Sequence, residues 1–129
     1  MRDDWRSAAI QGDSEVIERL LAEGIAVDCL DRHGQTALML AALHGRDAVV
    51  RVLLDNAADK DVTAKYNLSA LMLAVINRHT TIAKQLVDAG ANTQIRGSGA
   101  PGFAHKTARE VAEHAGLDDL AAYIAQVEG

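Results

Sequence analysis

One decapeptide occurs twice in this chain, almost unchanged. Residues 36–45 read TALMLAALHG and residues 69–78 read SALMLAVINR, so the two copies begin 33 residues apart. A fixed spacing of this size is typical of a repeat protein, in which one supersecondary unit cannot bury its own apolar face and must stack on a neighbour. The chain is therefore predicted to form a row of similar units.

The repeat extends well beyond the decapeptide. Residues 31–63 align with residues 64–96 without a gap, and residues 7–31 fall into the same register one period earlier. The last unit needs a spacing of 38, which places five extra residues in the Gly-, Ser- and Pro-containing stretch RGSGAPGFAHK. We expect a single domain, 1–129, composed of an N-terminal capping repeat (1–30), two internal repeats (31–63 and 64–96) and a C-terminal capping repeat (97–129) with an inserted loop at 97–105.

Each unit follows the same internal pattern. A hydroxyl residue such as Thr36 is placed to cap a short helix, because its oxygen can accept an unpaired backbone N–H. A glycine such as Gly45 then turns the chain into a second helix, whose apolar residues form one stripe. Aromatic residues make up only 3% of the chain and hydrophobic residues 49%, which favours close-packed helices rich in Ala and Leu. The pattern predicts an all-α fold.

The sequence resembles the ankyrin repeat family. The family's pattern G-x-T-x-L-x-L-A-A-x-x-G is present here as GQTALMLAALHG, residues 34–45. The resemblance implies an ankyrin-repeat solenoid of helix-turn-helix units joined by β-turn or hairpin loops, and it covers nearly the whole chain as four units, two of them terminal.

At three positions this chain has another residue where the matching position of a different unit has glycine. Asn67 and His105 occupy the turn position that Gly34 holds, and both residue types tolerate a positive φ better than most. Ala57 replaces the glycine that follows the second helix at positions 24 and 90. If this residue must be left-handed, alanine is unfavourable there, and Ala57→Gly is expected to stabilise the fold.

Composition and motifs argue against several classes of function. The formal charge is −5 and Lys and Arg form no run, so we expect no nucleic-acid partner; no stretch approaches 18 consecutive apolar residues, so we expect no membrane segment. Cys29 is the only cysteine, which fits a reducing, cytoplasmic location. The five His residues lie in no metal-binding motif, and GAPGFAHKT lacks the Gly-Lys of a phosphate loop. We predict no catalytic residue, no metal and no cofactor.

The resemblance places partner-binding residues on the turn tips and on the exposed face of the first helices. These positions are Arg32, His33, Gln35, Lys65, Tyr66 and Leu68 at the tips, and Leu43, His44, Ile76 and Asn77 on the helices. Arg and Tyr are frequent interface anchors, and Leu43, Leu68 and Ile76 are predicted to form an exposed apolar patch. The alternative is that Leu43 and Ile76 pack between units and the charges only solvate the surface.

The tips also gather positive charge in an acidic chain. Arg32, Lys65, Arg96 and Lys106 fall there, which predicts a partner with an acidic patch and binding that salt weakens. The inserted loop contains Phe103; its composition fits a disordered expansion better than an extension of the binding surface.

The resemblance implies a non-catalytic protein–protein interaction module. A scaffold or adaptor role and an inhibitor or immunity-type role both remain open, as does an accessory subunit that regulates an enzyme. The start at Met1 and the capped last unit favour a whole, small, bacterial protein, and we expect a monomer.

Overall fold

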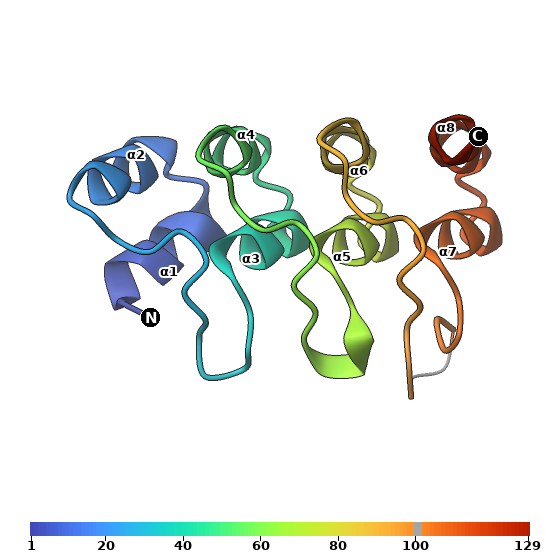
Figure 1. Ribbon diagram of the computed structural model, residues 1–129, viewed down its shortest axis with the longest axis horizontal. Coiled ribbons are helices and arrows are strands. Elements are labelled where there is room, and N and C mark those ends of the chain that lie inside the picture. The colour runs from blue at the N-terminus through green and yellow to red at the C-terminus, as the bar shows by residue number, and fades with distance from the viewer. Residues whose placement is uncertain (100–101) are drawn as a thin grey trace.

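The structure, a computed structural model, describes residues 1–99 and 102–129 (Figure 1). Within these ranges the chain forms eight α-helices, arranged as four antiparallel pairs that stand side by side. The inner row consists of α1 (Asp3–Gln11), α3 (Ala37–His44), α5 (Ala70–Ile76) and α7 (Ala108–His114). The outer row consists of α2 (Ser14–Ala22), α4 (Asp47–Asp55), α6 (Thr80–Asp88) and α8 (Asp118–Glu128). The predicted all-α solenoid is confirmed.

Three extended loops project from the same side of the stack (Figure 1). We call them the first finger (residues 26–36), the second finger (residues 59–69) and the third finger (residues 92–99 and 102–106). The second finger contains a short 3₁₀ turn, η1 (Lys65–Asn67). Each finger leads directly into an inner helix, so the position of its tip is set by the packing of that helix.

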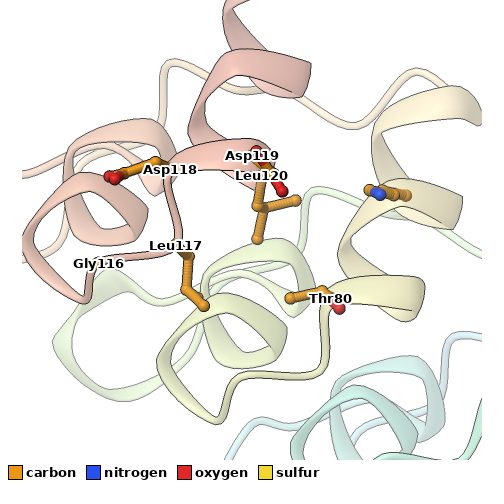
Figure 2. Close-up of a pocket in the computed structure, with 7 residues that line it drawn as sticks. Thr80, Gly116, Leu117, Asp118, Asp119 and Leu120 are labelled. Atoms are coloured by element: carbon orange, nitrogen blue, oxygen red, sulfur yellow. The ribbon is translucent and has the colours of Figure 1, made fainter.

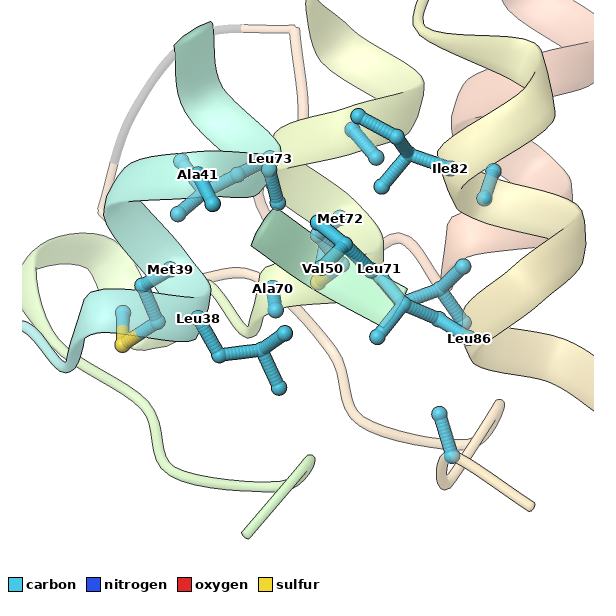
Figure 3. Packing of buried hydrophobic residues seen from close by; sticks show 14 of the residues in the cluster. Leu38, Met39, Ala41, Val50, Ala70, Leu71, Met72, Leu73, Ile82 and Leu86 are labelled. Atoms are coloured by element: carbon cyan, nitrogen blue, oxygen red, sulfur yellow. The ribbon is translucent and has the colours of Figure 1, made fainter. Parts of the chain in front are cut away.

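The two middle inner helices, α3 and α5, are short and deeply buried because each has an inner helix on both sides. In α3 every residue from Ala37 to Ala42 is buried, and in α5 every residue from Ala70 to Val75. Figure 3 shows α5 between its neighbours, with Leu38 and Met39 of α3 on one side and Ile82 and Leu86 of α6 on the other. Small Ala side chains let successive helices approach closely, and one apolar core therefore runs through all four pairs.

Three buried hydroxyls mark the starts of α3, α5 and α7. Thr36, Ser69 and Thr107 are each at most 5% exposed, and each hydroxyl oxygen accepts the backbone N–H three residues later at 3.2–3.4 Å. An N-cap of this kind stabilises a helix by about 1 kcal/mol. The predicted N-cap role of Thr36 is confirmed, and the same device fixes the point where each finger ends.

Gly45 is constrained both by its backbone and by the next unit. Its φ is +76°, a conformation that residues with a Cβ rarely adopt. A Cβ added there would lie 2.7 Å from Cε1 of His79. The His79 ring is also at hydrogen-bond distance from the carbonyl oxygen of Leu43, with Nε2 at 3.2 Å. The turn of one unit is therefore the docking site for the turn of the next.

Arginine side chains make the corresponding links at the other two junctions. Arg46 Nε donates to the carbonyl oxygen of Ile10 at 2.7 Å, and Arg78 Nη1 donates to that of Ala115 at 3.1 Å. Helix ends leave backbone carbonyls without intrahelical partners. These bonds satisfy such carbonyls from the adjoining unit, so stacking is polar at the turns as well as apolar in the core.

Gly45→Ala is expected to lower the free energy of unfolding by about 2–3 kcal/mol. The added Cβ has two effects: it strains the left-handed backbone, and it clashes with His79. Urea unfolding followed by circular dichroism measures the loss. In a His79→Ala background the same change is expected to cost only about 1–2 kcal/mol, which is the conformational part. An equal loss in both backgrounds would show that the close contact does not constrain residue 45.

Ala57→Gly is expected to raise the melting temperature by several degrees. Ala57 has a φ of +60°, so the left-handed conformation on which the expected stabilisation depends is present, and glycine avoids a cost there of about 1–2 kcal/mol. Ala89→Gly is the matched control, because Ala89 has an ordinary φ of −79° and glycine is expected to destabilise that position. An unchanged or lower melting temperature for Ala57→Gly would contradict the prediction.

Candidate protein-binding surface

The first finger is held by a carboxylate at its base. Asp31 Oδ1 accepts the backbone N–H groups of His33 at 2.8 Å and Gln35 at 2.9 Å. Asp31 Oδ2 lies 3.5 Å from Nε of Arg6 on α1, and the Asp31 side chain is only 3% exposed. Short acidic side chains commonly bind the backbone of a turn in this way. The finger is thus fixed from within, and Arg32 and His33 remain exposed at its tip.

The environment of Asp31 keeps its carboxylate charged. Burial alone raises the pKa of Asp31, but the N–H donors of Gln35 and His33, together with the Arg6 guanidinium, outweigh it and hold the pKa below its usual value. The charged form is therefore the one that braces the finger.

The second finger has no equivalent carboxylate, since Ala64 aligns with Asp31. Two consecutive residues of its turn, Tyr66 and Asn67, have φ values of +61° and +56°. The turn is held from the third finger: Asn67 Nδ2 donates to the carbonyl oxygen of Arg96 at 2.9 Å, and the Ser98 N–H donates to that of Tyr66 at 2.8 Å. The positive φ expected for Asn67 is confirmed, and so is that of His105, at +62°.

The third finger folds onto the second. Gly97 N–H donates to the carbonyl oxygen of Lys106 at 3.0 Å, and His105 N–H donates to that of Gly97 at 2.8 Å. The Phe103 ring lies 5.9 Å from the Tyr66 ring, centroid to centroid. Residues 97–99 and 102–105 of the insertion are thus ordered against the second finger, unlike the disordered expansion that composition favoured; Ala100 and Pro101 lie outside the described residues.

The predicted exposed apolar patch is wrong for one of its three members. Leu68 is only 7% exposed, because it directly precedes the buried N-cap Ser69 and its side chain turns into the core. Leu43 and Ile76 are half-buried and pack against that core. Gln35, which aligns with Leu68, is likewise half-buried. Leu68 therefore belongs to the core, whereas Leu43 and Ile76 leave part of their side chains accessible to solvent.

His44 lies at the exposed end of α3 in a positive neighbourhood. Partial burial lowers its pKa first, and Arg46, Arg6 and His79 lower it further. Nearby Asn77 is exposed, and its Nδ2 donates to the carbonyl oxygen of Leu73 at 2.8 Å. The grouping of His44 with Arg6 and His79 could not be predicted from the sequence, because these residues come from three different units and match no motif.

Two of the four predicted cations are engaged within the third finger. Arg96 Nη1 donates to the carbonyl oxygen of His105 at 2.6 Å and to Glu110 Oε1 at 3.1 Å, and Lys106 Nζ donates to the carbonyl oxygen of Gly102 at 2.9 Å. Arg32 and Lys65 are exposed and make no ion pair within the part of the chain that the structure describes. The positive charge offered at the tips is therefore mainly theirs.

Several open clefts lie on the surface of the described residues. One of about 450 Å³ lies where α6 and α8 begin, on the outer row (Figure 2). Its ionisable side chains are Lys84, Asp118 and Asp119, and Thr80 lines it as well. Among residues 1–99 and 102–129, no three His, Cys, Asp or Glu side chains are grouped to hold a metal ion. None of the helices within those ranges is both long and apolar enough to cross a membrane.

Comparison with known proteins agrees with the repeat. A family model described as ankyrin repeats, in three copies, matches residues 6–96. No curated protein sequence matches the chain. Among solved structures, the chain is similar to one in the complex of the Bd0816 predatory endopeptidase from Bdellovibrio bacteriovorus with immunity protein Bd3460; identity is 28% and the TM-score 0.85. The match covers 95% of this chain and 62% of that one, so this chain spans less than two thirds of its length.

Asp31→Ala is expected to lower the free energy of unfolding by about 1–3 kcal/mol at pH 7, because it removes a buried, charge-assisted brace. The pKa of Asp31 is lowered on folding, so its contribution is present above the unfolded value, near 4, and is lost as the pH falls through the folded value. Urea unfolding at pH 7 and pH 3 is expected to show the gap between wild type and variant closing. Exposed Asp55→Ala is the control; a gap that persists at pH 3 would assign the loss to packing alone.

Proposed function

Because the chain belongs to the ankyrin repeat family, whose repeats are protein-interaction modules, we propose that it binds a partner protein without catalysing a reaction. The binding surface consists of the finger tips and the exposed ends of the inner helices. Its residues are Arg32 and His33 on the first finger, Lys65 and Tyr66 on the second, and His44 and Asn77 on α3 and α5. Leu43 and Ile76 contribute a half-buried floor.

The observation that carries the proposal is that the tips are rigidly held while their side chains stay exposed. Asp31 fixes the first finger, and the third finger fixes the second. A surface whose geometry is set before binding loses less conformational entropy on binding. Such bracing serves recognition, since the exposed tips bury no core of their own.

The charges suggest a partner with an acidic patch. Arg32 and Lys65 are exposed, and burial, followed by the guanidinium groups of Arg46 and Arg6, lowers the pKa of His44. The formal net charge of the whole chain is −5, so these exposed cations have the opposite sign from the molecule as a whole. Charge complementarity of this kind steers association and weakens with salt.

The structural similarity supports a second, narrower candidate function. The similar complex contains an immunity protein bound to an endopeptidase, and the likeness at 28% identity extends over 95% of this chain. An inhibitor or immunity-type role, with an enzyme as the partner, therefore stands beside the adaptor role. An inhibitor is expected to hold one enzyme in a stoichiometric complex and to abolish its activity, whereas an adaptor leaves activity intact.

The first test is capture of the partner from a lysate of the source organism, with two matched double variants. Arg32→Ala/His44→Ala alters the proposed surface; Arg19→Ala/Arg51→Ala is the control, because it removes two exposed cations from the outer helices α2 and α4. We expect wild type and the control to retain one protein at low salt and the surface variant to lose it, with weaker retention at 0.5 M NaCl. Equal retention by both variants would place binding elsewhere. The activity of a captured enzyme, with and without this chain, then separates inhibitor from adaptor.

A further inference from the structure

The second and third fingers meet through the rings of Tyr66 and Phe103, whereas the first finger contains no Phe, Tyr or Trp. We propose that Lys65, Tyr66 and Phe103 form a preassembled recognition site for an acidic segment of a partner protein that carries a large apolar side chain. This inference rests on the proposed function and deepens it, because it names the chemistry that the tips recognise. It also assigns a role to the insertion.

The backbone of the second finger does not account for a tyrosine at its tip. Tyr66 has a φ of +61°, which glycine or asparagine adopts more readily than an aromatic residue. The first finger reverses direction with Gly34 as its left-handed residue, at +74°. Strained residues persist where the surroundings hold them, and they are concentrated at functional sites. Because the turn itself disfavours tyrosine, the presence of Tyr66 requires a reason that lies in its ring.

The insertion supplies the surroundings that hold this ring. The N–H of Ser98 donates to the carbonyl oxygen of Tyr66 at 2.8 Å, and a Cβ on Gly99 would lie 3.6 Å from Tyr66 Cδ1. A Cβ on Gly97 would lie 2.4 Å from the carbonyl oxygen of Phe103, so the loop can cross there only as glycine. The crossing brings Phe103 to Tyr66 at an interplanar angle of 58°, a favourable tilted pair.

The ring is positioned but not covered. Tyr66 is 39% exposed, and Nζ of Lys65 stands 4.9 Å from its centroid. A contact made only for stability would bury both rings; here an apolar surface stays open beside a cation. Tyr at an exposed and rigid position is a frequent interface anchor.

The charges around the site determine the kind of segment that fits. His105 is exposed nearby, and Lys106 and Arg96 lie at the base of the same finger. The neighbouring carboxylate, Glu110, already accepts from Arg96 and from the N–H of Thr107. An acidic segment is therefore complementary, and a basic one is repelled. The aromatic pair adds a requirement for an apolar side chain within that segment.

Three synthetic dodecapeptides test the proposal by NMR titration of the intact protein at low salt. The first has Glu and Asp on both sides of a central Phe, the second has Ala in place of Phe, and the third has Lys in place of the acids. We expect the first to shift the ring resonances of Tyr66 and Phe103, the second to bind at least fivefold more weakly, and the third to cause no shift. Equal binding of the first two, or binding of the third, would overturn the proposal.

Two variants connect the binding to the geometry. Tyr66→Gly removes the ring and relieves the backbone, and Gly97→Ala keeps both rings but prevents the loop from crossing. Both are expected to weaken the first peptide at least tenfold. Gly24→Ala adds a Cβ that meets nothing within 4 Å but is strained by its φ of +97°, so it controls for lost stability and is expected to bind like wild type. Wild-type affinity in Tyr66→Gly would overturn the proposal.

If the Arg32→Ala/His44→Ala variant loses a captured partner while no peptide binds, the proposed function stands and this inference fails.

Discussion

Each unit of this chain carries one apolar stripe that its own residues cannot cover, so every unit depends on its neighbour for a core. The inner helices express this dependence most fully, since nearly every side chain of α3 and α5 is buried between adjacent helices. In the terminal units one side of the inner helix has no neighbouring unit, and there charged side chains appear, as in the Arg109–Glu113 and Arg109–Glu128 pairs of the last unit. Stacking thus buries the faces between units and leaves charged side chains on the outward faces of the two terminal units.

The same stacking positions the surface proposed to bind. The buried hydroxyls of Thr36, Ser69 and Thr107 fix where each finger ends and each inner helix begins. Contacts between the turns, such as His79 against Gly45, set the spacing from one unit to the next. The finger tips therefore inherit their relative positions from a core in which they take no part. Function is then free to reside in side chains whose replacement does not disturb that core.

Much of this arrangement could be predicted from the sequence because it is local or periodic. The repeat predicted the helices, and the hydroxyl at position 36 predicted an N-cap. The alanine at position 57, where two other units have glycine, indicated a residue that could be strained, and its φ is left-handed. Leu68 was misplaced because the direction of a side chain next to a turn depends on the path of the backbone, which no apolar count reveals. The Tyr66–Phe103 contact was missed because its partners are distant in sequence, and Gly, Ser and Pro between them indicate a loop without saying where it packs.

The two ways of bracing the fingers have unequal consequences for how this surface can change over evolution. The first finger is braced by Asp31, a residue within its own unit, so its tip can accept new side chains one at a time. The second and third fingers share hydrogen bonds and a ring contact, so a substitution in one alters the support of the other. Variation among descendants of this chain should therefore be independent at Arg32 and His33 but correlated between Tyr66 and the segment around Phe103. Because of the insertion, the second and third fingers are expected to change together in evolution rather than separately.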